Sequence, residues 1–559
     1  MNIVVRRLIA QLALPGLVAG GLAVGAGAPA AAERAARGAP SQVVAPVPRL
    51  DWQPCGAGLE PFLCTKAEVP TDYDHPRGPT TTVALTKLPA SGSSKARLGT
   101  LFTNPGGPGG SGVEFVQLAA LAVYPEQIRA QYDILGFDPR GVAGSDPATC
   151  FRTQEDEASS PLLAVTYPVT RPQERRFLAE SRELAVRCQT TSPVRFANAS
   201  TANVARDMDL LRQAVGDQRL TYIGYSYGTF LGATYAKLFP GRVGKFVLDG
   251  PVDPVAWTGT GTGINAHSVP LGIRIGQSAG GYQTFREFAR LCREGGPANC
   301  PLAAAGDPAV TVLNAFDRLL KDPLELPLPD GSTLEITQQI AVAATFQSLY
   351  APAAWPDLAQ FLLLLVTSTA DPEKISTAAA RTPSELGARL RGEDYPSIGG
   401  ALASLCVDGA KTGRPDRYPA FADAADARSP YFGRFRTWVS SPCESWKLTD
   451  DDAYQGPWQQ TTRTPVMVIG TRSDPATPYR NAHPYANRFP DARLVTHEGW
   501  GHPALIQSTC VTNLIIRYLI AGQPPADGIN CSTDVVPFTS PVQAVSRSQV
   551  KVPAMTPVW

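Results

Sequence analysis

One short segment of the chain has the residue types of a nucleophilic serine in a sharp turn. The segment GYSYG at 224–228 has the pattern G-x-S-x-G and joins an apolar run at 219–223 to a helical pattern at 229–239. The glycines are needed because such a strand-to-helix turn is too sharp for side chains at those positions. The pattern predicts that the Ser226 hydroxyl is exposed above a sheet, where it can attack an acyl group. The alternative is an ordinary strand-to-helix turn without chemistry.

A serine hydroxyl needs a general base. The five histidines of the chain are His75, His267, His483, His497 and His502. In this setting the partners follow in the order serine, acid, histidine, which excludes His75. His502 stands in a glycine-flanked loop after the last predicted strand, so it is the expected base, with His497 as the second choice. Asp474, in a turn after the apolar run at 465–470, is the expected acid that orients the imidazole; a helix-capping role is compatible.

A second segment, NPGGPGGSG at 104–112, contains G-x-G-x-x-G between Gly107 and Gly112. It joins an apolar run to a helical pattern, and Asp138 ends the next apolar run. These features are typical of a dinucleotide-binding turn. Pro108 disfavours that interpretation, because proline removes a backbone N–H from a phosphate cradle.

The same glycine-rich loop has another interpretation, in which it binds a transient oxyanion. Serine hydrolases with this turn take one donor from the N–H after the nucleophile and another from the loop after the third strand. We therefore expect the N–H groups of Tyr227 and Gly107 to form the oxyanion hole. Asp138 and Arg140 are interpreted mainly as loop scaffolding.

The elements that must position these residues alternate between strand and helix. Apolar runs at 99–103, 133–138, 219–223, 243–248, 465–470 and 493–496 are predicted to be strands. Their alternation with amphipathic helices indicates a buried, mostly parallel sheet, and runs at 62–69 and 81–88 add antiparallel strands. The interval between 249 and 465 is far longer than a crossover needs. The predicted class is α/β, an α/β-hydrolase fold with helices on the sheet and a large, mainly helical cap inserted before the strand that carries Asp474.

Composition and the N-terminus indicate the compartment. The chain has 559 residues and a net charge of +1 without a basic block, so nucleic acid is not an expected partner. The basic start MNIVVRR, the apolar stretch after it and the small residues up to Ala32 are typical of a secretory signal peptide. An uncleaved membrane anchor is the alternative, which the Pro and Gly content of the stretch disfavours.

Ten cysteines fit an exported protein, because thiols oxidise outside the cytoplasm. A metal site would need tight Cys-x2-Cys spacing, which the chain lacks, and we expect no cofactor. Neighbouring cysteines are expected to pair. The expected disulfides are Cys55–Cys64, Cys150–Cys188, Cys292–Cys300, Cys406–Cys443 and Cys510–Cys531.

As a set, the motifs resemble those of the secreted tripeptidyl aminopeptidases of the α/β-hydrolase superfamily. The motifs are NPGGPGGSG, GFDPRGVAGSD, GYSYGT, VLDGPVDP and PVMVIGTRSDPATP with GWGHPA, and they cover most of residues 50–531. The resemblance implies a serine exopeptidase that removes short peptides, typically tripeptides, from free N-termini. These enzymes are similar to proline iminopeptidases, whose loop reads HGGPG. Asn104 and Pro105 stand where those have histidine before the glycines, which weakens a transfer of strict proline specificity.

The resulting division of the chain has six parts. We expect a signal peptide at 1–32, a flexible leader or propeptide at 33–48, the first part of the hydrolase core at 49–260, a helical cap at 261–440, a TAP-like C-terminal part of the core at 441–535 and a Pro- and Val-rich tail at 536–559.

An exopeptidase that measures from a free amine needs a carboxylate at a fixed distance from Ser226. Glu114, Asp408 and Asp253 are candidates, and for each the alternative is an ordinary solvated or capping acid. The expected partners are peptides with free N-termini, without a membrane after signal cleavage, and the expected state is a monomer. A secreted carboxylesterase or lipase with the same triad is the main rival, and an inactive binding protein is the second, because fold does not determine substrate.

Overall fold

The computed structural model of the chain describes residues 45–163, 166–260, 268–327, 333–368 and 398–540. The expected signal peptide, nearly all of the expected leader and most of the expected tail lie outside these ranges, as does His267. The described residues all belong to one unit, Val43–Trp559. Within them, no helix combines the length and the apolar character needed to span a bilayer.

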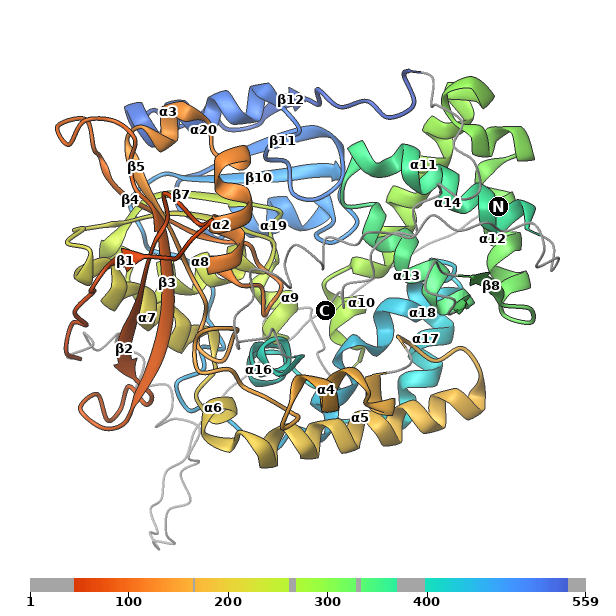
Figure 1. The fold of residues 1–559 in the computed structure, drawn as a ribbon, viewed down its shortest axis with the longest axis horizontal. Helices are drawn as coiled ribbons and strands as arrows, with labels where there is room; N and C mark the ends of the chain where they lie inside the picture. Colours follow the sequence, from red (N-terminus) through yellow and green to blue (C-terminus); the bar gives the residue numbers. More distant parts are fainter. Residues whose placement is uncertain (1–44, 164–165, 261–267, 328–332, 369–397, 541–559) are drawn as a thin grey trace, which may run out of the picture. The chain divides into compact units, whose positions relative to one another are not determined.

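The described residues form a ten-stranded sheet in the order β1-β2-β3-β5-β4-β6-β7-β10-β11-β12 (Figure 1). The strands are β1 Gln53–Pro54, β2 Leu63–Pro70, β3 Thr80–Leu88, β4 Gly99–Asn104, β5 Tyr132–Phe137, β6 Leu220–Tyr225, β7 Val243–Asp249, β10 Val466–Ser473, β11 Ala492–Trp500 and β12 Ile529–Ser532. The first four strands in this order pair antiparallel, and those from β5 onward pair parallel. The predicted mostly parallel sheet is confirmed, while β1 and β12 were not predicted.

Helices cover both faces of this sheet, which explains its long apolar runs. One face is covered by α2 Gly112–Val123, α3 Glu126–Arg129 and α20 Thr509–Ala521, the other by α7 Thr201–Ala214, α8 Tyr227–Leu238 and α19 Ala482–Ala486. Alternate residues of a strand point to opposite faces: Ile223 and Val247 pack in the first cluster, Tyr222 and Phe246 in the second. Because both faces are buried, the strands have no polar side.

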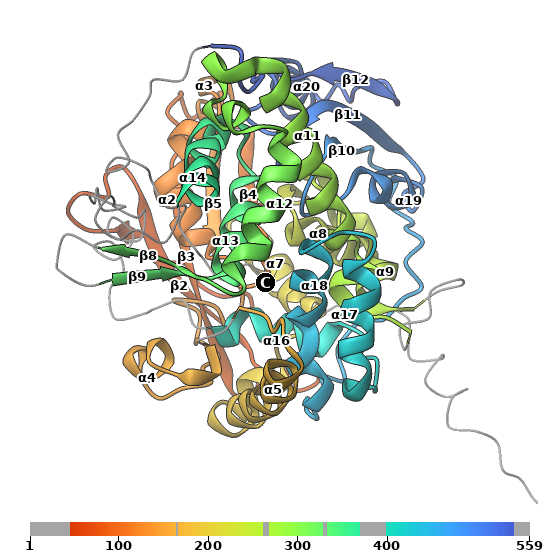
Figure 2. The ribbon, with the colours of Figure 1, turned by 90° about the vertical axis from the view of Figure 1, so that its right-hand side faces the viewer.

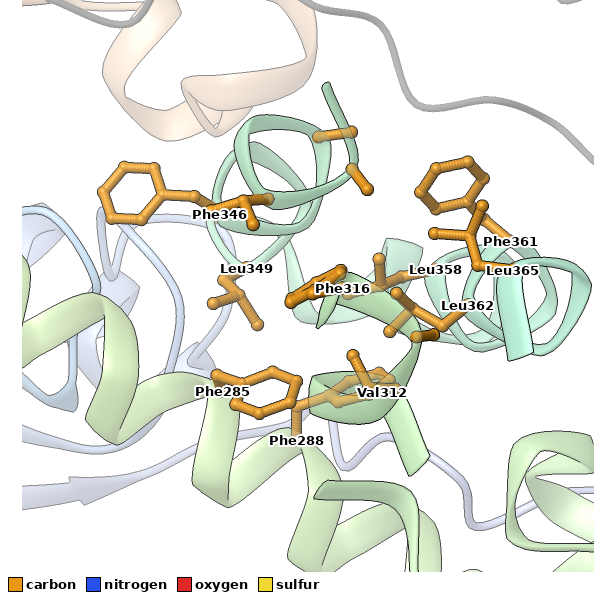
Figure 3. Packing of buried hydrophobic residues seen from close by; sticks show 14 of the residues in the cluster. Phe285, Phe288, Val312, Phe316, Phe346, Leu349, Leu358, Phe361, Leu362 and Leu365 are labelled. Carbon is orange, nitrogen blue, oxygen red and sulfur yellow. The ribbon is translucent and has the colours of Figure 1, made fainter. Parts of the chain in front are cut away.

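Between β7 and β10 the chain forms a mainly helical layer, called the cap below. Its helices include α10 Leu271–Arg274, α11 Gln277–Asn299, α12 Pro308–Leu319, α13 Gln338–Ser348, α14 Trp355–Thr367, α16 Ile398–Asp408, α17 Tyr418–Asp426 and α18 Phe432–Thr437, and a short hairpin of β8 Leu324–Pro327 and β9 Thr333–Ile336 joins them. Figure 3 shows Phe285, Phe316 and Leu362 of this layer's hydrophobic cluster, which come from three of these helices. Burial of each such side chain contributes about 1.5–3 kcal/mol, so the cap has a hydrophobic core of its own.

A segment before β6 also packs on the cap, which the expected boundary at 260 did not predict. Helix α5 Arg171–Thr191 begins at a capping box, in which Thr170 and Gln173 bond to each other's backbone. It lies beside the cap helices in both ribbon views (Figures 1 and 2). The Ser181 and Ser441 hydroxyls are 2.8 Å apart, and Phe177 packs edge-on against Trp438. The cap layer is therefore built from two separate stretches of chain.

Five disulfides lie within the described residues, and they join the cysteine pairs expected from the sequence. Two of them link separate elements of the cap and core. Cys406–Cys443 ties α16 to the 3-10 helix Trp438–Ser445, and Cys510–Cys531 ties α20 to β12. A cross-link of this kind stabilises the fold mainly by restricting the unfolded chain.

Candidate active site

Parallel pairing brings the sequence-predicted groups to one edge of the sheet. Strands β4, β6, β7, β10 and β11 run in the same direction, so their carboxyl ends meet at the same edge. Ser226 directly follows β6, Asp474 follows β10, His502 follows β11, and the loop at 104–112 follows β4. Residues from four distant parts of the sequence are thus neighbours.

The turn at Ser226 has the strained geometry that a nucleophile elbow requires. Its backbone φ is 54° and ψ is −124°, values that residues other than glycine rarely adopt. The Ser226 N–H donates to the Asp249 carbonyl at 2.9 Å, and the Ser226 carbonyl accepts the Thr229 N–H at 2.8 Å. A Cβ on Gly224 would overlap the Gly228 carbonyl, and a Cβ on Gly228 would lie 2.8 Å from the Asn104 carbonyl oxygen, so neither position has room for a side chain. The hydrogen bonds on both sides hold the turn in place.

The Asp474 carboxylate is buried, and both of its oxygens accept hydrogen bonds. Oδ1 accepts the N–H groups of Ala476 at 2.8 Å and Thr477 at 2.7 Å, and Oδ2 accepts the Thr477 hydroxyl at 2.8 Å. Oδ2 also lies 2.7 Å from His502 Nδ1. Because a carboxylate only accepts hydrogen bonds, Nδ1 must carry the proton, which leaves Nε2 as the basic nitrogen. This is the tautomer that a general base needs.

The surroundings of His502 shift its pKa upward. Burial by itself lowers the pKa of the imidazole, but the charge of Asp474, its hydrogen bond and the charge of Asp249 outweigh that effect. The result is a pKa above the usual value of histidine. A raised pKa favours the imidazolium that forms when the base accepts a proton.

The cap contributes to holding His502, which the sequence did not reveal. The backbone N–H of His502 donates to the Tyr350 carbonyl at 2.8 Å. The rings of the two residues meet edge-on, with their centroids 5.4 Å apart. Gly250, after β7, lies under the imidazole, where a Cβ would come within 2.5 Å of its Cε1. Tyr350 lies in SLYAPAA, which has no recognisable motif, so no signal in the sequence pointed to it.

The glycine-rich loop lies directly against the nucleophile turn. A Cβ on Gly106 would lie 2.5 Å from the Tyr225 carbonyl oxygen, 2.8 Å from Ser226 Cβ and 3.0 Å from Tyr227 N. Only glycine permits this approach, and its φ of 95° also favours glycine. The Gly106 N–H already donates to Asn104 Oδ1 at 3.0 Å. The backbone of the loop at Gly106 thus lies directly beside Ser226 and the Tyr227 N–H.

Asp138 anchors this loop through hydrogen bonds to both of its carboxylate oxygens. Its Oδ1 accepts the Ser111 hydroxyl at 2.6 Å and the Val113 N–H at 3.1 Å, and its Oδ2 accepts the Gly144 N–H at 3.0 Å. Arg140 is likewise buried in an ion pair with Asp207. Both therefore act as scaffolding in the structure, as interpreted from the sequence.

The other described histidines lie away from this arrangement. His497 is buried within β11, where its Nδ1 lies 3.2 Å from the Thr471 hydroxyl and burial lowers its pKa to about 4. His483 and His75 are on the surface beside Tyr479 and Asp72. Within the described ranges, no three His, Cys, Asp or Glu side chains are arranged to hold a metal ion.

The candidate amine anchors differ in their surroundings, and for Asp408 and Asp253 the structure shows another role. Asp408 is only 1% exposed and accepts the N–H and hydroxyl of Thr201, at 2.9 and 2.5 Å. Asp253 caps α9 Pro254–Thr258 and pairs with Arg488 at 2.7 Å. Both carboxylates are therefore committed to the fold. The half-buried Glu114 side chain, in the first turn of α2, has no hydrogen-bond partner within the described ranges.

Comparison with known proteins gives matches along most of the chain. The model of the family described as "alpha/beta hydrolase fold" matches residues 99–273. The model of the family described as "TAP-like protein" matches residues 429–531. The chain is similar to serine protease Hip1 of Mycobacterium tuberculosis, with 31% identity over 86% of this chain and 91% of that protein. It is 28% identical to tripeptidyl aminopeptidase of Streptomyces lividans, over 91% and 90% of the two chains. It is 30% identical to carboxylesterase B of Mycobacterium tuberculosis, over 92% of this chain and 96% of that protein.

The close approach of Gly106 predicts that Gly106→Ala lowers hydrolysis of p-nitrophenyl acetate by ~10²–10³-fold in kcat, the loss that follows when an oxyanion donor is displaced. The added methyl group must push the loop away from the Tyr225 carbonyl. Gly216→Ala is the control, because Gly216 has a similar φ of 84° but nothing within 4 Å of its Cβ position. Equal rates for the two variants would contradict the proximity argument.

The raised pKa of His502 predicts the acid limb of the pH profile of kcat/KM. The imidazole must be neutral to act as a base, so activity should fall below a midpoint that lies above about 6.5, the ordinary pKa of histidine. Asp474→Asn removes the charge that raises this pKa, so the midpoint should move to lower pH while kcat falls by ~10⁴-fold. Asp307→Asn is the control, since Asp307 also accepts two backbone N–H groups, at a helix start in the cap. An unmoved midpoint in Asp474→Asn would exclude His502 as the titrating base.

Proposed function

The chain belongs to the tripeptidyl-aminopeptidase-like family of α/β-hydrolase serine peptidases, and on this premise we propose that it is a secreted exopeptidase acting near free N-termini. The observation that carries the proposal is the 2.7 Å contact of Asp474 with His502 Nδ1, at the edge of the sheet where Ser226 stands. The arrangement supports an acyl-enzyme mechanism in which Ser226 is the nucleophile, His502 the base and Asp474 the orienting acid.

In the proposed mechanism, Ser226 Oγ attacks the carbonyl carbon of the scissile peptide bond while His502 Nε2 takes the hydroxyl proton. Asp474 stabilises the imidazolium that results. The imidazolium then gives its proton to the leaving amine, and an acyl group stays on Ser226. Water, activated by the same imidazole, releases the acyl group and restores the enzyme.

The proposed oxyanion hole consists of the N–H groups of Tyr227 and Gly107. Tyr227 is the first residue of α8, whose first N–H groups have no partners within the helix. On the other side, Asn104 accepts the N–H of Gly106, whereas the N–H of Gly107, the next amide of the loop, has no hydrogen-bond acceptor within the described residues. This division of the two glycines supports Gly107 as the second donor.

Release of short peptides is supported by the relatives named tripeptidyl aminopeptidase in Streptomyces species. Of the carboxylates considered from the sequence, Glu114 remains the proposed anchor for the substrate amine, since Asp408 and Asp253 are committed to Thr201 and Arg488. A second candidate function is a carboxylesterase, favoured by the relative named carboxylesterase B. The same triad would cleave an ester, without the need for an amine anchor.

Secretion is part of the proposal and is supported by the N-terminal sequence and by the disulfides. The signal peptide would cover 1–32 and the leader 33–48, with core segments at 49–260 and 441–535 around a cap at 261–440 and a tail at 536–559. Five disulfides within the described residues fit an oxidising compartment.

Three substrates test the proposed function: Ala-Pro-Ala-p-nitroanilide, its N-acetylated form and a short-chain p-nitrophenyl ester. We expect fast release of nitroaniline from the free-amine peptide only, with Ser226→Ala and His502→Ala each reducing the rate by ~10⁴-fold or more. Glu114→Gln should raise KM for the free-amine peptide and leave ester cleavage unchanged, because the ester has no amine to bind.

The other outcomes separate the alternatives. Equal rates on both peptides would indicate an endopeptidase without an amine anchor. Cleavage of the ester alone would overturn the peptidase proposal in favour of a carboxylesterase. Full activity of either alanine variant would remove the residue in question from the mechanism.

A further inference from the structure

Asp249 is a buried carboxylate at the centre of the carboxyl edge, and the proposed mechanism gives it no role. It ends β7, where it pairs in register with Tyr225 of β6 and Ile469 of β10. It is 0% exposed, and within the described ranges no lysine or arginine pairs with it. A buried carboxylate without a cationic partner is costly to a fold, so its presence needs a reason.

The two carboxylate oxygens of Asp249 bind the backbone of the histidine loop. Oδ1 accepts the Ala504 N–H at 3.1 Å, and Oδ2 accepts the Leu505 N–H at 2.9 Å. These residues follow His502 in the same loop. Because each oxygen holds a different amide, the carboxylate determines the direction of the loop as well as its position, and therefore where the imidazole lies.

The backbone around Asp249 also binds the nucleophile turn. Its carbonyl accepts the Ser226 N–H at 2.9 Å, and the next residue, Gly250, donates to the Ile469 carbonyl at 3.0 Å. Gly250 in turn lies against the His502 ring. Asp249 thus binds Ser226 through its main chain and the loop of His502 through its side chain.

The charge of Asp249 acts on the same imidazole. The titratable groups that face it are His502, Asp474 at the end of β10 and Tyr225 at the end of β6. Burial raises the pKa of Asp249 to about 6, although its two amide hydrogen bonds and the charge of His502 lower it. Its charge is one of the influences that raise the pKa of His502.

We propose that Asp249 is a positioning residue: its carboxylate holds the loop of His502 at a fixed distance from Ser226, and its charge stabilises the imidazolium formed during acyl transfer. This inference rests on the proposed roles of Ser226 and His502. Asp249 itself neither touches the substrate nor transfers a proton, and it acts through His502.

The test is the pH profile of kcat/KM for Asp249→Asn, per active site titrated with a fluorophosphonate. The amide keeps the shape but loses the charge and one acceptor, and the lost hydrogen bond predicts a fall of about 10- to 100-fold, mainly in kcat. Loss of the charge should also move the acid midpoint to lower pH. If Asp249 were merely structural, its substitution would lower the number of titrated active sites and leave the acid midpoint unchanged.

Asp217→Asn is the matched control. The Asp217 carboxylate also accepts a backbone N–H, that of Thr100 at 2.9 Å, and burial also raises its pKa. It lies where β4 begins, at the opposite end of the strands. We expect this variant to have the kcat/KM and the acid midpoint of the unmodified enzyme.

A normal kcat/KM and an unmoved midpoint in Asp249→Asn would overturn the inference. If that variant does not fold, Asp249→Ser is measured in the same way; failure of both to fold, while Asp217→Asn folds, would assign the carboxylate to the fold alone and also overturn it. Ser226→Ala keeps the two proposals separate. An active Ser226→Ala would refute the proposed function, whereas an inactive one beside a normal Asp249→Asn would refute only the role of Asp249.

Discussion

The shared carboxyl edge of β4, β6, β7, β10 and β11 is the constraint on which the proposed site depends. Parallel pairing requires long connections between neighbouring strands, and it brings the ends of those strands together. Ser226, Asp474 and His502 each follow the end of a different strand at this edge. Backbone hydrogen bonds then set their spacing, as in the bond from the Ser226 N–H to the Asp249 carbonyl. The reactive geometry is therefore a property of the sheet as a whole.

The cap is physically part of this arrangement. The Tyr350 carbonyl holds the His502 N–H, and a Cβ on Gly109 of the glycine-rich loop would lie 2.8 Å from Ala401 N of α16. The cap therefore contacts the loop of the proposed base and the loop of the proposed oxyanion hole. Tyr350 packs against the hydrophobic core of the cap, whereas α16 packs in a cluster shared with Tyr227 and Phe230 of α8, so buried apolar packing supports both contacts.

The sequence was informative wherever local patterns reflect the fold. Strands buried on both faces appear as continuous apolar runs, and the glycines around Ser226 are required by its turn. Contacts made only in the folded chain left no such pattern. The burial of Asp408 depends on its contact with Thr201 from α7, and the packing of α5 on the cap depends on Ser441, far away in the sequence. The four-residue strands β8, β9 and β12 are too short to show a period.

The most direct test of the account is to trap the acyl-enzyme. The enzyme is mixed with a slowly hydrolysed p-nitrophenyl ester, quenched in acid, digested and analysed by mass spectrometry. The account predicts one acyl group per chain, located on Ser226, and no adduct in Ser226→Ala. An adduct on another residue, or turnover without any adduct, would contradict nucleophilic catalysis by Ser226.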